Sequence, residues 1–204
     1  MSTVLKGKRI AILVTDGFEQ IELTSPREAF EKAGAECVVV SDVEGKVQGF
    51  EHHDKADRFK VELALAEAKA TEFDAVLLPG GVINGDALRV MDDAQHFVQQ
   101  IDQAGKPVML ICHGGWVLIS AGLAKGRTIT SWPSLEDDFR NAGAHWMDDE
   151  CVRDRNWVSS RKPDDLPAFN RECLRVMTEG RPGAKQLDAP ARLADDAREG
   201  AERP

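Results

Sequence analysis

The sequence contains few cysteines and spaces them widely. The four cysteines among its 204 residues form no C-x-x-C pair, which argues against a disulfide-stabilised scaffold. Cys37 lies in a strand-like run and Cys173 in a helix-like run, so both are expected to be structural, as buried free cysteines usually are. The other two cysteines are Cys151 and Cys112, and the residues around Cys112 suggest a functional role.

The chain also lacks a basic stripe, the apolar stretch of a signal peptide in "MSTVLKGKR" at its start, and any apolar run of membrane-spanning length. Its formal net charge is −9, with a sequence pI near 5.1. This acidic balance argues against nucleic acid or an anionic membrane as a partner. We therefore expect a soluble, cytoplasmic protein.

Strand-like and helix-like segments alternate along the chain. Strands separated by helix-length segments predict an α/β fold with a mostly parallel sheet covered on both faces. Residues 44–57 are polar and predict a hairpin or an irregular loop. The predicted strands are 9–15, 36–41, 73–81, 107–112, 127–131 and a hairpin over 150–160; the predicted helices are 18–34 (kinked at Pro26), 86–104, 114–126 and 164–177.

The composition predicts one domain and a tail. The full chain has 42% hydrophobic residues, enough for a single domain with a full core, which we place over residues 1–178. From residue 179 to residue 204 the chain is rich in Gly, Pro, Ala and charge and has no clear periodicity. We expect an extended polar tail there, and assign it no function.

The stretch "PVMLICHGGW" (107–116) ends a buried strand in a cysteine, a histidine and two glycines. Neighbouring residues of a strand point to opposite faces, so Cys112 and His113 share a site only if the chain turns sharply. The glycines predict that turn. A thiol at a strand-to-helix elbow faces a helix N-terminus, which predicts a lowered pKa for Cys112. His113 is the candidate general acid or base.

Unusual polar residues follow three of the predicted strands. Sites in open α/β sheets form beyond the carboxyl ends of the strands, so "TDGFEQIE", "LPGG" and "CHGG" are expected to converge there. Glu19, protonated by burial, would donate a hydrogen bond to the sulfur. Backbone amides of Gly80, Gly81 and His113 would form an oxyanion hole.

Each of these signals has an ordinary structural explanation when it is taken alone. A Cys-His pair can be core, Glu19 can be a solvated first-turn residue, and "PGG" can be a loop; their combination favours a site. His52-His53-Asp54 could bind a metal, but adjacent histidines diverge and no metal site is predicted. His96 and His145 are expected at the surface, and Trp132, Trp146 and Trp157 in packing.

These motifs, over about residues 8–177, resemble the PfpI family of intracellular cysteine proteases and stress proteins. That family belongs to the superfamily of the Parkinsonism-associated protein deglycase and the class I glutamine amidotransferase-like proteins. The resemblance implies a flavodoxin-like three-layer sandwich. It also implies Cys112 as nucleophile, with Glu19 and His113 as its helpers. In the PfpI branch an acid contributed by a neighbouring subunit orients the histidine. Asp86 matches the position of that acid after a one-residue shift. A homodimer or larger homo-oligomer is therefore expected.

One departure from the family pattern affects the substrate pocket. The family usually has proline after "CHG", whereas this chain has Gly115 followed by Trp116. Trp116 is therefore expected to form the pocket wall beside the thiol and to contact substrate.

Together these features favour a cysteine hydrolase or lyase in the stress response. Its substrate would be a small reactive carbonyl, a glycated adduct, as for a deglycase or glyoxalase, or a peptide, as for a PfpI-type protease. The alternative is a non-enzymatic redox sensor in which Cys112 is oxidised reversibly. No cofactor is required by either reading.

Overall fold

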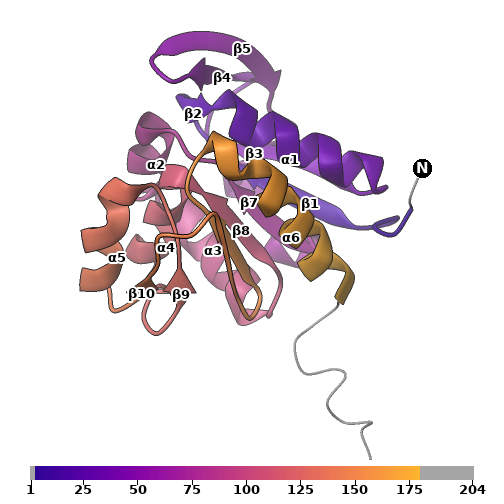
Figure 1. Cartoon of the computed structure of the whole chain (residues 1–204). Helices are drawn as coiled ribbons and strands as arrows, with labels where there is room; N and C mark the ends of the chain where they lie inside the picture. Colours follow the sequence, from indigo (N-terminus) through magenta and orange to yellow (C-terminus); the bar gives the residue numbers. More distant parts are fainter. Residues whose placement is uncertain (1–2, 180–204) are drawn as a thin grey trace, which may run out of the picture.

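The computed structural model describes residues 3–179, which form a central seven-stranded sheet (Figure 1). Six strands are parallel, and β11 pairs antiparallel with β12 at one edge. In spatial order the strands are β11 (Cys151–Asp154), β12 (Trp157–Ser160), β8 (Val108–Ile111), β7 (Ala75–Leu78), β1 (Arg9–Leu13), β3 (Glu36–Ser41) and β6 (Leu63–Ala64).

Helices cover both faces of this sheet, so the predicted three-layer α/β sandwich is confirmed. Alternate residues of β1 show the two sides, because Ile10 and Ile12 enter one apolar cluster while Ala11 and Leu13 enter the other. The first cluster includes side chains of α1 (Gln20–Lys32) and α6 (Leu166–Glu179). The second includes side chains of α2 (Val82–Leu88), α3 (Asp92–Gln103), α4 (Trp116–Ser120) and α5 (Glu136–Asn141).

Two small sheets complete the fold. The segment predicted as a hairpin or loop forms the hairpin of β4 (Lys46–Glu51) and β5 (Asp54–Lys60), which pairs with β2 (Phe18–Glu19). In Figure 1 this hairpin projects above the main sheet. The second small sheet pairs β9 (Thr128–Ile129) with β10 (His145–Trp146).

Several predicted boundaries were wrong. The helix expected over 86–104 is two helices, α2 and α3, separated by residues 89–91. The helix expected from residue 18 begins at Gln20, because Phe18 and Glu19 form β2, and α1 continues through Pro26. The sequence analysis did not predict α5. The tail predicted over 179–204 lies outside the described residues, apart from Glu179, the last residue of α6.

The order of the strands places the functional crevice. From β1 the chain proceeds to β3 and β6 on one side and then crosses to β7, β8 and β12 on the other. In such sheets ligands bind beyond the carboxyl ends of the strands at this change of direction. The loops that follow β1, β7 and β8 therefore meet at one place. They contain Gly17, Gly80 and Cys112.

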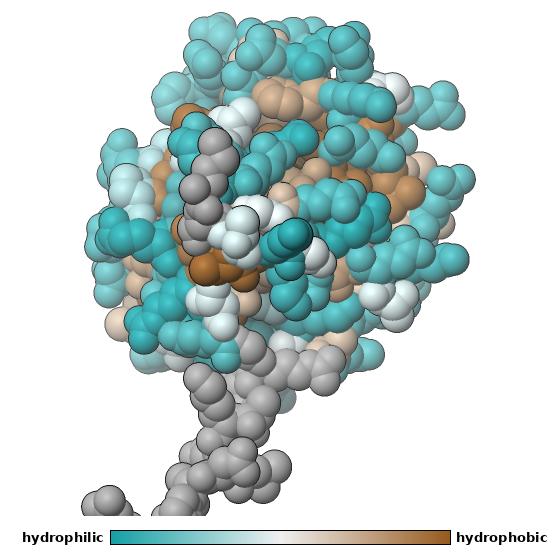
Figure 2. Space-filling model, turned by 90° about the vertical axis from the view of Figure 1, so that its right-hand side faces the viewer, coloured by the Kyte–Doolittle hydropathy of each residue, from teal (hydrophilic) through white to brown (hydrophobic). Residues whose placement is uncertain are grey.

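One face of the molecule is largely polar. Hydrophilic side chains dominate the face shown in Figure 2, with apolar areas between them. No helix of residues 3–179 is both long and apolar enough to cross a bilayer.

Candidate active site

Cys112 occupies a sharp elbow directly after β8. Its φ of +59° lies in the left-handed region that residues with a side chain rarely adopt. The chain then runs through a short 3₁₀ turn, Cys112–Gly115, into α4. A Cβ on Gly115 would lie 2.6 Å from the ring of Phe139, and one on Gly114 would collide with the carbonyl of Leu78. The glycines therefore allow the turn that the sequence analysis expected.

The thiol of Cys112 is surrounded by donors but is poorly solvated. Its Sγ lies 3.1 Å from Nδ1 of His113 and accepts the backbone N–H groups of Gly81 and His113. Burial of the sulfur and the nearby Glu22 carboxylate raise the pKa of the Cys112 thiol, and these N–H groups oppose the rise. The predicted lowering of its pKa is therefore wrong. The helix that was expected to lower it, α4, has only five residues.

The carboxyl group at the sulfur belongs to Glu22. This residue is completely buried, its Oε2 accepts the Gly80 N–H at 2.8 Å, and its carboxyl interacts with the Cys112 thiol. Burial raises its pKa from the usual 4.5 to about 8. Its buried Oε1 has no hydrogen bond of normal geometry to another described residue. An ionised oxygen in that position would be costly, so Glu22 keeps a proton that it can share with the sulfur.

Two predicted roles are corrected by this arrangement. Glu19 lines the same cavity, but its Oε2 accepts the N–H of His52 at 3.0 Å, and Glu22 takes the place at the sulfur expected for Glu19. The Gly80 N–H is occupied by Glu22 and is not a free oxyanion donor. The amides of Gly81 and His113 remain the donors at the reacting atom.

The loop after β7 has no room for larger residues. A Cβ on Gly80 would lie 2.6 Å from both the Cβ of Cys112 and Oε2 of Glu22. Gly81 has a φ of +87°, which favours glycine. Asn84 was not predicted as a site residue. Its buried amide accepts the Thr15 N–H at 2.8 Å and donates to the carbonyls of Pro79 and Gly80 at 2.9 and 3.0 Å. Asn84 thus joins the loops after β1 and β7.

His113 lies between two tryptophans. Its ring centroid is 5.0 Å from that of Trp116 and 6.1 Å from that of Trp132, which is stacked on it. Burial lowers the pKa of His113 from 6.5 to about 4, so the imidazole is neutral at pH 7. A neutral imidazole can accept a proton from a thiol or pass one to substrate.

The two tryptophans exchange their expected roles. The indole N–H of Trp116 donates to Asp138 at 2.7 Å, and Trp116 is not among the residues that line the cavity. Trp132, expected in packing, is 38% exposed and lines the cavity instead. Trp146 and Trp157 are buried, as predicted. The wall that a substrate would meet is therefore Trp132.

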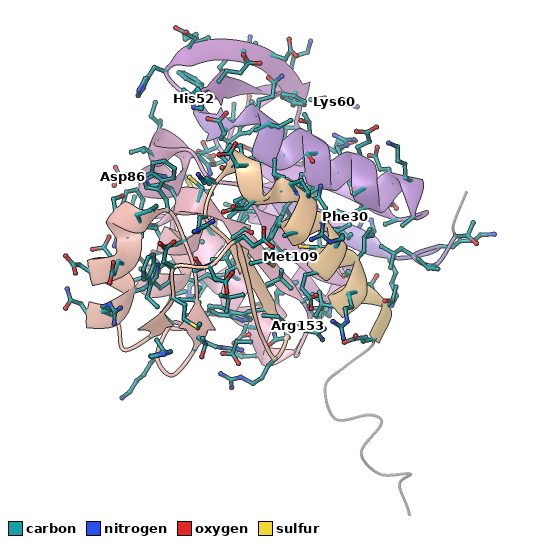
Figure 3. All side chains as sticks on the ribbon, viewed as in Figure 1. Phe30, His52, Lys60, Asp86, Met109 and Arg153 are labelled. Atoms are coloured by element: carbon teal, nitrogen blue, oxygen red, sulfur yellow. The ribbon has the colours of Figure 1, made fainter. Side chains whose placement is uncertain are left out.

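These groups open into a cavity of about 680 Å³. Cys112 and His113 line this cavity, and so does the tip of the β4–β5 hairpin, where His52 is labelled in Figure 3. Most of its accessible lining is apolar. The lining residues are Glu19, His52, His53, Gly81, Val82, Cys112, His113, Trp132, Ser134 and Pro163.

Asp86 lies on α2 and is exposed (Figure 3). Its neighbour Gly85 packs so closely on His113 that a Cβ there would lie 2.6 Å from the His113 carbonyl oxygen. Among the hydrogen bonds of residues 3–179, His113 has none with a carboxylate. The structure therefore brings the helix of Asp86 to the site, while no carboxylate of residues 3–179 is hydrogen-bonded to the His113 ring.

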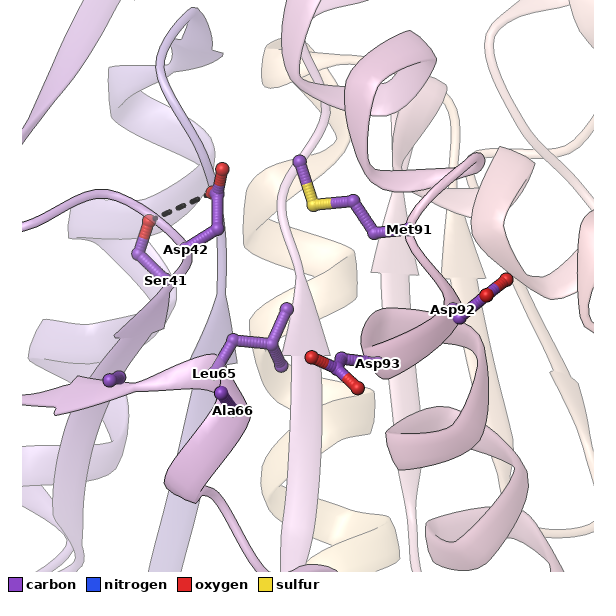
Figure 4. Close-up of a pocket in the computed structure, with 8 residues that line it drawn as sticks. Ser41, Asp42, Leu65, Ala66, Met91, Asp92 and Asp93 are labelled. Atoms are coloured by element: carbon purple, nitrogen blue, oxygen red, sulfur yellow. Dashed lines mark hydrogen bonds between the residues drawn. The ribbon is translucent and has the colours of Figure 1, made fainter.

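A second cavity, of about 520 Å³, lies between the end of β3 and the first turn of α3 (Figure 4). Its side chains include Asp92 and Asp93, with the Ser41 hydroxyl hydrogen-bonded to Asp42 at 3.5 Å, and it contains neither cysteine nor histidine. Within residues 3–179, no three His, Cys, Asp or Glu side chains form a cluster able to hold a metal ion. Cys112 and His113, the candidate nucleophile and the candidate proton-transfer group, line the other cavity.

Comparison with known proteins agrees with this geometry. Residues 8–176 match the sequence model of the DJ-1/PfpI family. The chain belongs to that family. It is 45% identical over 171 residues to "Putative cysteine protease YraA" of Bacillus subtilis, an alignment that covers 84% of this chain and 99% of that protein. It is 43% identical over 173 residues to "Protein/nucleic acid deglycase 2" of Escherichia coli, covering 84% and 98%.

Solved structures of the family share the fold. A two-domain protein of Anabaena variabilis with a DJ-1/ThiJ/PfpI-like domain superposes with a TM-score of 0.78 and 33% identity, covering 89% of this chain and 52% of that one. Drosophila melanogaster DJ-1beta superposes with a TM-score of 0.74 and 25% identity, covering 88% and 90%. Membership of the DJ-1/PfpI family and its flavodoxin-like fold are thus established for this chain.

Proposed function

We propose that this DJ-1/PfpI protein is a cysteine-dependent enzyme acting on 2-oxoaldehydes and on the adducts that they form with amines and thiols. The observation that carries the proposal is the buried Glu22 carboxyl beside the Cys112 thiol at an open cavity. Two N–H groups stabilise charge on the sulfur, and the His113 imidazole can move protons. The name deglycase, carried by similar proteins, is consistent with this chemistry.

The reaction begins with one proton shared by two groups. When Glu22 holds it, Cys112 is a thiolate with donors from Gly81, His113 and the carboxyl itself. The thiolate attacks the aldehyde carbon, a C–S bond forms, and the carbonyl electron pair moves to oxygen, which takes the proton through His113. Because the two N–H donors lie beside the sulfur, they can also stabilise the negative charge when it moves to the neighbouring oxygen.

Two kinds of substrate pass through this hemithioacetal: a free 2-oxoaldehyde forms it by addition, and an amine adduct forms it by displacement of the amine. With a 2-oxoaldehyde, His113 removes the proton from the former aldehyde carbon, the neighbouring carbon gains a proton, and the hydroxyl proton of the first carbon moves to the oxygen of the second, which leaves a thioester of a 2-hydroxy acid. Water cleaves the thioester to a 2-hydroxy acid and the free thiol. With an amine adduct, the C–S bond forms as the C–N bond breaks, and the amine leaves with a proton from His113.

The decisive experiment uses methylglyoxal and two matched variants. Cys112→Ser should lower consumption of methylglyoxal by at least about a hundredfold, because the alcohol is a far weaker nucleophile at neutral pH. Cys151→Ser, a control at a partly exposed thiol, should retain activity within about twofold, since surface changes have small effects. Consumption and 2-hydroxy acid formation are measured together.

Other outcomes would favour the alternatives. Wild-type protein that consumes no methylglyoxal but cleaves an unfolded polypeptide, dependent on Cys112, would indicate a protease. Absence of both activities, with stoichiometric oxidation of Cys112 by peroxide, would indicate a redox sensor.

We also propose that a second copy of the chain completes the site through Asp86. Val82 and Ile83, on the same helix, are large apolar side chains with 55% and 56% of their surface exposed, which suits a protein interface. Mixing Cys112→Ser with Asp86→Ala should restore activity, because one site of the mixed dimer keeps both residues. Subunit exchange is first verified by mass spectrometry. Exchange without recovered activity would contradict a shared site.

A further inference from the structure

The charges around the Cys112 cavity are strongly one-sided. Of its ten lining residues, Glu19 is the only carboxylic acid, and none is lysine or arginine. The other groups there that can ionise are Cys112 and the three histidines His52, His53 and His113. Histidine carries a positive charge only when it is protonated, and at pH 8 an ordinary imidazole is neutral. Above neutral pH the lining therefore has no fixed positive charge.

Glu19 is held at this cavity by its contact with the hairpin. Its side chain is only 12% exposed, and its Oε2 accepts the His52 N–H at 3.0 Å. A partly buried charge is screened by salt less than a surface charge is. Lys55 and Arg58 line a separate hollow of about 310 Å³ together with Asp16 and Gly17, and Lys162, which precedes the lining residue Pro163, is paired with Asp164 at 3.1 Å. They do not offset Glu19 inside the cavity.

The reactive state adds a second negative charge. A thiolate on Cys112 requires that Glu22 keep its proton, and the sulfur then faces the same space as the Glu19 carboxylate. A substrate with its own carboxylate or phosphate would bring a third negative charge into a mostly apolar cavity. A neutral or cationic substrate meets no such repulsion.

We infer that the cavity selects neutral and cationic carbonyl substrates against anionic ones, and that Glu19 is the residue that determines this specificity. The inference rests on the proposed function only in taking Cys112 as the reacting atom. It assigns Glu19 a role in place of the hydrogen bond to sulfur that the sequence analysis expected.

Alkylation of Cys112 tests this selection without any turnover. Iodoacetamide and iodoacetate deliver similar groups and differ in charge, and 2-bromoethylamine supplies a cationic reagent. Rates are measured at pH 8 for each cysteine by mass spectrometry, and the same chain in denaturant gives the intrinsic ratios. In the folded wild type the preference for iodoacetamide over iodoacetate should exceed the intrinsic ratio by about tenfold or more, the effect of one nearby charge.

Variants assign the effect to one side chain. Glu19→Gln should bring the ratio to within about threefold of the intrinsic value, because the amide keeps the shape and removes the charge. Glu19→Asp should keep most of the preference for iodoacetamide over iodoacetate, and 2-bromoethylamine should keep most of its higher rate relative to iodoacetate. Glu44→Gln, the same charge change at an exposed residue outside the cavity lining, should leave the ratio unchanged.

Equal ratios in wild type and Glu19→Gln would overturn the inference. Selection that disappears equally in Glu44→Gln would also overturn it, because the net charge of the surface would then be the cause. The two proposals fail separately. Charge selection in alkylation without consumption of methylglyoxal would reject the proposed function alone. Turnover of phenylglyoxal and 4-carboxyphenylglyoxal at equal kcat/KM would reject the selection alone.

Discussion

Two glutamates three residues apart show how the surroundings separate identical side chains. Glu22 lies on the inner side of the site, fully buried against the thiol, with its pKa raised to about 8. Glu19 lies at the rim, where it lines the cavity and holds the hairpin through the N–H of His52. The inner glutamate is suited to sharing a proton, and the outer one to placing a negative charge before an incoming substrate. Burial, more than residue type, determines which chemistry each can perform.

The inner side should be the less tolerant of change, and Gly80→Ala should show the largest effect. The new Cβ would lie 2.6 Å from Cys112 and from Glu22, inside a packed elbow. We expect a loss of about 2–4 kcal/mol in the free energy of unfolding, as overpacking of a tight site produces. Urea denaturation measures it.

Gly122→Ala is the control for Gly80→Ala. Gly122 has a φ of +73° and open space where a Cβ would be, so only backbone strain of about 1–2 kcal/mol is expected. A smaller loss for Gly80→Ala than for Gly122→Ala would show that the inner side is not tightly packed.

An intermediate effect is expected from the pH dependence of stability. Glu22 has a folded pKa of about 8 against a usual 4.5, so the folded chain holds the extra proton. The contribution of Glu22 to the free energy of unfolding is complete below pH 4.5 and is lost as the pH rises toward 8. The pKa of His113 is lowered from 6.5 to about 4, so its contribution to stability is complete above pH 6.5 and is lost as the pH falls toward 4. The pH slopes of stability due to Glu22 and His113 therefore oppose each other between pH 4.5 and 6.5.

Between pH 6.5 and 8 the Glu22 slope is unopposed by His113. The free energy of unfolding of the wild type should fall there by about 2 kcal/mol relative to Glu22→Gln, at about 1.4 kcal/mol for each pH unit. Unfolding curves of both proteins across this window provide the measurement. Parallel profiles for the wild type and Glu22→Gln would show that Glu22 is ionised at neutral pH, contrary to the protonated state that its burial indicates.

The smallest effect is expected at the rim. Glu19→Gln keeps an acceptor for the His52 N–H and removes only the charge. The free energy of unfolding should therefore change by less than about 1 kcal/mol. Thermal unfolding of Glu19→Gln beside Glu22→Gln makes the comparison. A loss at Glu19 equal to that at Gly80 would remove the distinction between rim and inner side.

The sequence predicted the place of the site better than the partners within it. Strand ends carrying Gly80-Gly81 and Cys112-His113 converge because parallel strands bring their carboxyl ends to one edge. The choice between Glu19 and Glu22 depended on where α1 begins, and helix boundaries are poorly marked in a sequence. A usable signal was present: Glu22 shares a face with Pro26 and Phe30 at a spacing of four residues.

Other features depend on distant segments. Trp132 and the hairpin tip reach the cavity only through the tertiary fold, since neither is near Cys112 in sequence. The amide of Asn84 joins the loops after β1 and β7, a role that no local pattern reveals. The raised pKa of Cys112 follows from burial, whereas the sequence displayed only the elbow and a helix start.

The central claim is that Cys112 and Glu22 ionise as a pair, and the pH profile of Cys112 alkylation by iodoacetamide tests it most directly. Glutamine resembles the protonated carboxyl but cannot ionise, so Glu22→Gln removes the carboxylate that raises the pKa of the Cys112 thiol. We predict that Glu22→Gln lowers the midpoint of Cys112 alkylation by at least about one pH unit relative to the wild type, and that Glu19→Gln shifts the midpoint less. A shift in Glu19→Gln with none in Glu22→Gln would contradict the account.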